Sequence, residues 1–163
     1  MAVKVVYASI SEKGTINGKK GDQTGKEVRT RDYYNFGQTY YFRFNTSHDA
    51  WWMADIAKRI ADNPKVGYGQ SDRQSSFNYL KNNGWQSGKI YSPVNTDCSE
   101  LVVISMNCIY ERVVLKADTY TGNLYSRLRA TGKGKIHKIT SSYKPKKGDI
   151  VWKPNKHAVI VYG

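Results

Sequence analysis

The sequence predicts an α+β fold in which N-terminal helices pack on an antiparallel sheet. Three observations support this class: apolar residues recur at helical spacing in the first half, a long apolar stretch follows residue 98, and β-type segments crowd residues 135–162. The chain has 163 residues, of which 39% are hydrophobic, so it can bury one core and is too apolar for a disordered tail. We therefore expect residues 1–163 to form a single domain.

The first 45 residues predict a loop-rich N-terminal segment of this domain. Residues 14–27, rich in Gly, Thr and Lys, are predicted to form turns and a loop, and the Asn17-Gly18 pair is a hairpin signal. Residues 3–10 and 39–44 are β-type and flank this loop.

Four helices are predicted downstream. Trp52, Ile56 and Ile60 form an i, i+4 stripe over residues 48–62, and Asn63-Pro64 closes that helix. The other helices are expected over residues 71–83, from residue 98 onward, and over roughly residues 121–130.

Helix ends and the final strands complete the expected fold. Gly84 is a C-terminal signal for the second helix, and Asp97 or Thr96 can cap the third. Lysine-rich turns separate three β-type segments at residues 135–140, 148–153 and 157–162.

Positive charge is concentrated near the C-terminal end of the sequence. The chain carries 26 Lys+Arg against 13 Asp+Glu, a formal charge of +13, and residues 112–163 hold twelve basic and two acidic residues. Such a field attracts a polyanion: nucleic acid, an acidic membrane or an anionic cell wall. The alternative is a solvated lysine-rich surface that aids solubility.

Cys98 and Cys108 are predicted to be free thiols. Ten residues of one helix separate them, or ~15 Å at ~1.5 Å per residue, whereas a disulfide needs Cα atoms within about 7 Å. No CxxC or HxxxH spacing occurs, so we expect no metal site. No apolar run approaches the ~20 residues of a membrane span, and the first residues lack a secretion-signal pattern.

One constellation of residues can perform nucleophilic chemistry: NTDCSELV at 95–102 and KHAVIVYG at 156–163. If Cys98 lies in the first turn of a helix, the unpaired N–H groups and the helix dipole favour its thiolate and can stabilise an oxyanion. An imidazole such as His157, at the start of an apolar strand, would complete a Cys–His pair for acyl transfer. The alternative for each residue is a structural role in the core.

These motifs resemble the NlpC-type, papain-like cysteine peptidases of bacterial cell walls and their relatives, the CHAP amidohydrolases. DCSELV, KKGDIVW and HAVIVYG occur in the order found in that superfamily, and the match covers residues 95–163. Residues 11–35 and 66–80 also resemble the front of phage-borne lysins. The resemblance implies a papain-like fold, with the catalytic Cys at a helix N-terminus, the His on an adjacent strand, and no cofactor.

The resemblance assigns roles to residues of both motifs. Cys98 would be the nucleophile and His157 the general base that takes the thiol proton and returns it to the leaving amine. Asp97 would cap the helix or orient the loop, and Ser99 would lie beside the nucleophile as a capping residue. Asp149 would shape the turn into its strand.

Other candidates have a structural alternative. Asp22 and Gln23, in a polar GDQTG loop, could orient the histidine or bind substrate, or simply form a surface turn. Tyr68 could donate to the oxyanion, or pack against the helix. The chain departs from the family pattern at Glu100, which replaces a Gly, and at Lys156, which precedes the His. We expect Glu100 to raise the pKa of the nearby thiol.

The third polar residue that the superfamily places after the histidine has no counterpart, because the sequence ends six residues beyond His157. Either another segment supplies this residue, or the pair acts alone, or the sequence is a piece of a longer protein.

The resemblance predicts a peptidoglycan hydrolase that cleaves an amide bond, as an amidase or as a stem or cross-bridge endopeptidase, through a cysteine acyl-enzyme. Its basic C-terminal third would bind teichoic acids. We expect a phage lysin made in the host cytoplasm without a signal peptide and released to the wall, or the excised domain of a larger wall enzyme. The alternative is a basic, non-catalytic protein that binds nucleic acid or wall, although no nucleic-acid-binding motif is found.

Overall fold

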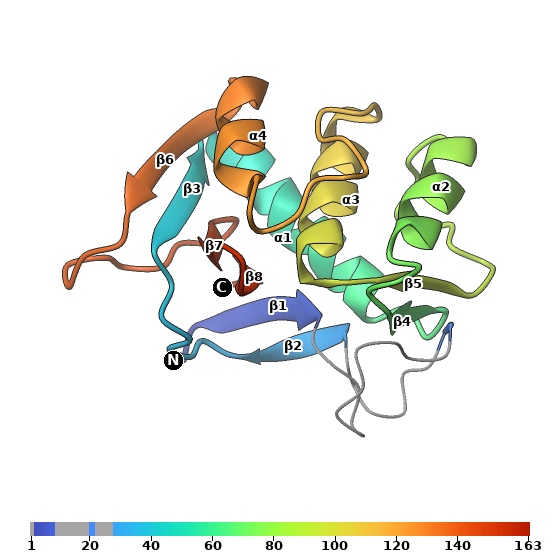
Figure 1. The fold of residues 1–163 in the computed structure, drawn as a ribbon, viewed down its shortest axis with the longest axis horizontal. Helices are drawn as coiled ribbons and strands as arrows, with labels where there is room; N and C mark the ends of the chain where they lie inside the picture. The colour runs from blue at the N-terminus through green and yellow to red at the C-terminus, as the bar shows by residue number, and fades with distance from the viewer. Residues whose placement is uncertain (1, 9–19, 22–27) are drawn as a thin grey trace.

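The computed structural model describes residues 2–8, 20–21 and 28–163, and these residues form four helices and a six-stranded antiparallel sheet (Figure 1). The α+β class is therefore confirmed. The strand order across the sheet is β2-β1-β8-β7-β3-β6. The strands are β1 (Lys4–Ala8), β2 (Val28–Asp32), β3 (Tyr40–Phe44), β6 (Gly134–Lys138), β7 (Ile150–Lys153) and β8 (His157–Val161).

Both ends of the chain build this sheet. β1 pairs with β8 at Val5–Val161 and Val6–Ile160, while β3 pairs with both β6 and β7. The sequence did not predict β2, because its VRTRD run lacks alternating apolar residues. β2 is an edge strand with an exposed face, so polar side chains suffice there. The predicted Asn17-Gly18 hairpin lies outside the described residues.

The four predicted helices are confirmed, with small shifts of their ends. α1 begins after Thr46, whose hydroxyl accepts a hydrogen bond from the Asp49 N–H at 3.1 Å. Gly84 ends α2 as predicted: its φ is +71°, and the next N–H, that of Trp85, donates to the Leu80 carbonyl at 2.8 Å. The helices are α1 (Ser47–Ala61), α2 (Gln74–Asn82), α3 (Cys98–Tyr110) and α4 (Leu124–Thr131).

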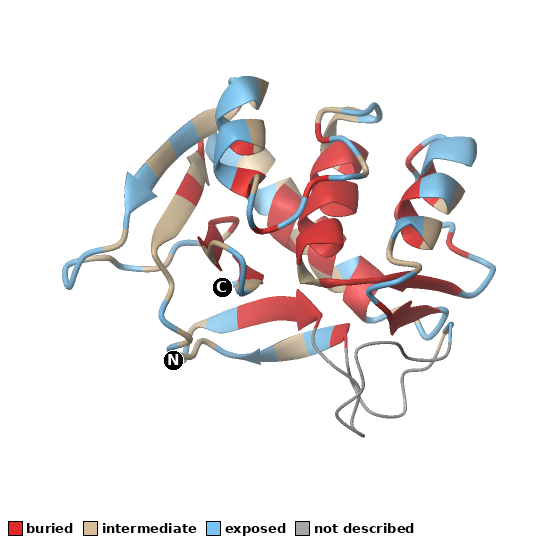
Figure 2. Cartoon of the chain, in the orientation of Figure 1, coloured by how far each residue is buried: buried red, intermediate tan, exposed pale blue. Residues whose placement is uncertain are grey.

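α3 is the central helix of the fold. Residues 99–108 of α3 are all buried (Figure 2), and the helix contacts α1, α2 and β8. A helix that is apolar on every side is stable only inside a core. A two-stranded parallel sheet, β4 (Val66–Tyr68) and β5 (Val94–Thr96), leads into its N-terminus. Each of these strands has three residues, too few for a sequence pattern to reveal.

Two apolar clusters cover opposite faces of the main sheet. Because successive strand side chains alternate between faces, Ala158 and Ile160 of β8 join the cluster that includes the helices. Val159 and Val161 join the smaller cluster on the other face, together with Tyr7. None of the described helices has both the length and the apolar character needed to cross a membrane.

Asn107 fixes the loop that follows α3. Its side chain is fully buried, and it donates to the Leu115 carbonyl at 2.9 Å while accepting from the N–H groups of Val114 and Leu115 at 2.8 and 2.9 Å. We predict that Asn107→Ala destabilises the fold by about 2–4 kcal/mol, because buried polar groups lose their partners. Thermal unfolding should then show a fall in Tm of roughly 5–15 °C.

The exposed Asn78 on α2 provides the control, because its side chain makes no hydrogen bond or ion pair with other described residues and its replacement by Ala should leave Tm nearly unchanged. Equal Tm values for Asn107→Ala and Asn78→Ala would contradict the proposed role of Asn107.

Candidate active site

Asp97 caps the helix that carries the predicted nucleophile. β5 ends at Thr96, and Cys98 is the first residue of α3. One Asp97 carboxylate oxygen accepts the Glu100 N–H at 2.8 Å and the Ser99 hydroxyl at 3.2 Å. Asp97 therefore occupies the capping position considered in the sequence analysis, and Ser99 supports the cap.

A largely buried arginine, Arg73, joins this cap to the rest of the site. Its Nη1 lies 3.6 Å from Asp97 Oδ1 and 3.3 Å from Glu100 Oε2, and it donates to the Thr119 carbonyl at 2.8 Å. The sequence analysis missed Arg73. The one available signal was Glu100, since an acidic residue inside an apolar helix needs a buried cation or a proton.

Glu100 is fully buried, and its Oε1 has no hydrogen-bond partner among the described residues. Burial raises its pKa to about 9, against the opposing effect of Arg73, while Asp97 and Asp118 raise it further. Glu100 is therefore mostly protonated at neutral pH. The negative charge that we expected Glu100 to place near the thiol is absent, and Asp97 supplies it instead.

The Cys98 thiol lies against β8 and is protonated at neutral pH. The backbone N–H groups of Ala158 and Ser99 lower the pKa of the thiol and so favour the thiolate. Burial opposes them and, with the negative charge of Asp97, raises the pKa of the thiol to about 12. The N–H groups at the helix N-terminus favour the thiolate in the expected direction, but burial and the charge of Asp97 outweigh them. The prediction that Cys98 and Cys108 are free thiols is confirmed.

His157 lies in an aromatic cluster on the sheet face away from the helices. Its ring centroid is 5.0 Å from that of Phe36 and 6.2 Å from those of Tyr7 and Tyr34. Its Nε2 is buried and has no partner among the described residues. Burial, and to a lesser extent the positive charges of Arg31 and Lys156, lower the pKa of His157 to about 4.

Cys98 thus lies near the start of β8, where His157 is the first residue, but no hydrogen bond joins the two side chains in the described structure. The Ala158 N–H lies near enough to the sulfur to lower the pKa of the thiol, and His157 is the preceding residue, but the side chains of His157 and Ala158 point to opposite faces of the sheet. Tyr34 lies near both: its ring packs near His157, and a thiolate at Cys98 would raise its pKa. The other two histidines lie elsewhere, with His137 stacked on Tyr41.

Tyr68 lies beside the cap of α3. It pairs with Thr96 across β4 and β5, and its hydroxyl accepts a hydrogen bond from Gln70 Nε2 at 3.0 Å. Burial, together with the charges of Cys98 and Asp97, raises its pKa to about 12, so its phenol remains a hydrogen-bond donor. The other two candidates, Asp22 and Gln23, lie outside the described residues.

Asp149 organises the turn between β6 and β7. Its buried carboxylate accepts two hydrogen bonds from Arg43, at 2.9 and 2.7 Å, and one from the Tyr143 hydroxyl at 2.9 Å. It also accepts the Lys146 N–H at 3.0 Å, which closes the turn. These contacts match the turn-shaping role expected for Asp149.

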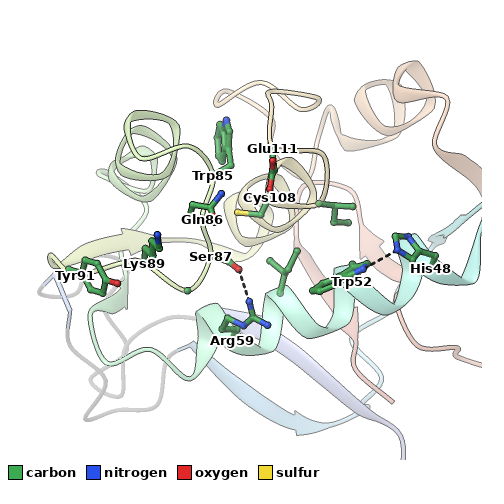
Figure 3. Close-up of a pocket in the computed structure, with 13 residues that line it drawn as sticks. His48, Trp52, Arg59, Trp85, Gln86, Ser87, Lys89, Tyr91, Cys108 and Glu111 are labelled. Atoms are coloured by element: carbon green, nitrogen blue, oxygen red, sulfur yellow. Dashed lines mark hydrogen bonds between the residues drawn. The ribbon is translucent and has the colours of Figure 1, made fainter.

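A well-formed pocket among the described residues lies away from Cys98. It has a volume of about 470 Å³ and lies at the C-terminal end of α3 (Figure 3). In the described residues, no three His, Cys, Asp or Glu side chains gather in a way that could hold a metal ion.

The fold and this site define a class of protein: an α+β scaffold that brings a thiol, at the N-terminus of a buried helix, to a strand that begins with a histidine. A family model described as an endolysin-like domain matches residues 5–163, and the chain belongs to this family. Membership indicates a phage-type lytic enzyme that acts on the bacterial cell wall, with peptidoglycan as its substrate. Searches of curated proteins and of solved structures gave no significant match.

The unusual state of Glu100 makes a prediction about stability. The folded-state pKa of about 9 exceeds the ordinary value of 4.5, so the native protein holds this proton more tightly than the unfolded chain does. Stability is therefore lost as the pH rises from about 4.5 to about 9. Glu100→Gln cannot ionise, so its stability relative to wild type should rise by about 2–4 kcal/mol between pH 5 and pH 8.

Urea unfolding at both pH values measures this difference. Glu111→Gln, at the exposed end of α3, is the matched control and should follow the wild-type pH dependence. Parallel stability curves for wild type and Glu100→Gln would show that Glu100 is ionised in the native state.

Proposed function

We propose that this protein cleaves an amide bond of peptidoglycan by a cysteine acyl-enzyme mechanism, with Cys98 as nucleophile and His157 as general base. The observation that carries the proposal is the position of the thiol: it starts a buried helix and lies close enough to β8 for the Ala158 N–H, one residue after His157, to favour its thiolate. The buried, unpartnered Nε2 of His157 is available to accept a proton. The bond could be the amide between sugar and stem peptide, or one within the stem or cross-bridge.

The reaction requires the imidazole to turn toward the sulfur. At His157, β8 is paired only with β7, because the described β1–β8 pairing is confined to Ile160 and Val161. Among the described residues, His157 therefore has no paired strand on the side of β8 that faces β1. Catalytic hydrogen bonds are often long or misaligned before substrate binds, so we propose that substrate brings the two groups into a papain-like arrangement.

Proton transfer then accompanies bond formation. The Cys98 sulfur attacks the amide carbon while His157 takes the thiol proton, and the N–H groups at the start of α3 stabilise the oxyanion. The C–N bond breaks as His157 returns the proton to the leaving amine. Water, deprotonated by His157, hydrolyses the resulting thioester and regenerates the thiol. The protonated phenol of Tyr68 is a further donor available to the oxyanion.

The aromatic cluster substitutes for the third polar residue of related hydrolases. Tyr7, Tyr34 and Phe36 pack around the His157 ring and hold it neutral through burial. The resting pair is therefore a neutral thiol and a neutral imidazole. The proton moves during the reaction, in contrast to enzymes that keep a preformed thiolate–imidazolium pair.

The basic C-terminal third can hold the enzyme on an anionic wall. Its exposed side chains include Lys135, Lys138 and Lys144, and Lys156 is exposed immediately before His157. We propose that these lysines attract teichoic acids and raise the local concentration of enzyme at its substrate.

Removal of the thiol tests the nucleophile. Cys98→Ala should abolish the clearing of purified Gram-positive walls, measured as turbidity, because no group can form the acyl-enzyme. Asn78→Ala is the control, since Asn78 is exposed on α2 and should not affect the chemistry. Equal clearing by Cys98→Ala and wild type would exclude Cys98 as nucleophile.

The pH dependence of activity tests the base. His157 must be neutral to accept a proton, and its pKa is about 4, so kcat/KM on a soluble muropeptide should fall as the pH drops through about 4. An imidazole in water would instead place this acid limb near pH ~6.5. An acid limb at the higher value, or one that persists in His157→Ala, would contradict the assignment.

A further inference from the structure

The pocket at the C-terminal end of α3 has no role in the mechanism above. Figure 3 shows it enclosed by α1, by the end of α3 and by the loop after α2. We propose that this pocket binds the glycan strand of peptidoglycan, in addition to the contact with the scissile amide at Cys98. Sugar binding at this pocket does not depend on the proposed function; only the accompanying cleavage at Cys98 rests on it. Its lining includes His48, Trp52, Arg59, Gln86, Ser87 and Tyr91.

The lining combines aromatic faces with hydrogen-bonding groups. The Trp52 indole N–H donates to His48 Nε2 at 3.2 Å, which fixes the orientation of the ring in the pocket. Tyr91 is 69% exposed, and its backbone N–H is anchored to the Tyr79 hydroxyl at 3.0 Å. Aromatic rings pack against the C–H faces of pyranoses, and a side-chain amide such as that of Gln86 can bind hydroxyl and acetamido groups.

The charge balance of the pocket favours an uncharged ligand. Arg59 is paired with Asp55 at 2.8 Å and also donates to the Ser87 hydroxyl at 3.4 Å. The remaining charges of the lining, those of Lys89 and Glu111, are of opposite sign. A phosphate polymer such as teichoic acid would require an excess of cations. A neutral N-acetylated sugar matches these side chains better.

The loop after α2, which forms one wall of the pocket, is held in a strained backbone conformation. Trp85 has a φ of +60°, a left-handed value that is rare for a bulky residue and costs about 1–3 kcal/mol. Two contacts stabilise it: its N–H donates to the Leu80 carbonyl at 2.8 Å, and its ring packs edge-on against Phe77 at 5.1 Å. These contacts fix the backbone of the segment that follows, residues 86–89, which lines the pocket. A preformed wall lowers the entropy cost of binding.

The distance between the two sites suits a polymer. Ile109 lines the pocket and lies eleven residues beyond Cys98 on α3, which corresponds to ~16 Å at ~1.5 Å per residue. A single glycan strand with its attached peptides can therefore contact both ends of this helix.

Titration with the β-1,4-linked tetramer of N-acetylglucosamine tests the pocket directly, because this probe has no peptide bond to a stem. Binding to the full chain is measured by tryptophan fluorescence and by ¹H–¹⁵N NMR. Trp52→Ala should weaken binding by about tenfold or more. Tyr120→Ala is the control: Tyr120 is an aromatic residue that is 48% exposed and lies outside the pocket, so its replacement should change affinity by less than about twofold.

Two exposed variants address the concern that Trp52→Ala could perturb folding. Tyr91→Ala and Gln86→Ala should each weaken binding by about threefold or more, without changing Tm. No binding at millimolar sugar, equal effects of Tyr120→Ala and Trp52→Ala, or binding of a glycerol-phosphate oligomer in place of the sugar would each overturn the proposal.

The Cys98→Ala protein separates this inference from the proposed function. It should bind the tetramer with wild-type affinity while failing to clear walls. If it binds the sugar and still clears walls, the nucleophile assignment fails and the glycan site stands. If neither the wild type nor Cys98→Ala binds the sugar, while only the wild type clears walls, the glycan site fails and the proposed function stands.

Discussion

The contact between Arg73 and the N-terminal cap of α3 supports the rest of the structure. A helix that is buried along almost its whole length must find partners for its first N–H groups inside the protein, and Asp97 accepts that of Glu100. Arg73 in turn accompanies the buried carboxyl groups of Asp97 and Glu100, and ties them to the Thr119 carbonyl. The same cap determines where Cys98 lies, because the thiol is the next residue. The core and the candidate active site therefore depend on one polar cluster.

Burial shifts the pKa values of the groups at this site so that each group favours its neutral form. The pKa of Cys98 is raised to about 12, that of Tyr68 to about 12, and that of His157 is lowered to about 4. Every one of these groups is therefore neutral at physiological pH. A neutral thiol at this partly buried position tolerates desolvation better than a thiolate, and it becomes reactive only when a base accepts its proton. Substrate binding thus controls reactivity in this account, through the contact between sulfur and imidazole.

The sequence could predict the parts of the structure that repeat a pattern over many residues. The helical stripe on α1, the glycine at the end of α2 and the apolar run of α3 each indicated the correct element. The short strands β4 and β5 carried no such pattern, and β2 was hidden by its exposed polar residues. Cys98 and His157 were recognised from their motifs, but Arg73, Tyr34 and Phe36 were not. Their contacts with the site join residues far apart in the chain, which local spacing does not reveal.

The central claim is that Cys98 forms a covalent bond to the acyl part of a peptidoglycan amide. Mass spectrometry of the protein, quenched in acid during turnover of a soluble muropeptide, tests it most directly. The account predicts a mass increase equal to the acyl fragment on the peptide that contains Cys98, and none on the peptide segment around Cys108. His157→Ala should prevent the adduct from forming. Turnover by wild type and by Cys98→Ala at the same rate, with no adduct on either protein, would contradict the account.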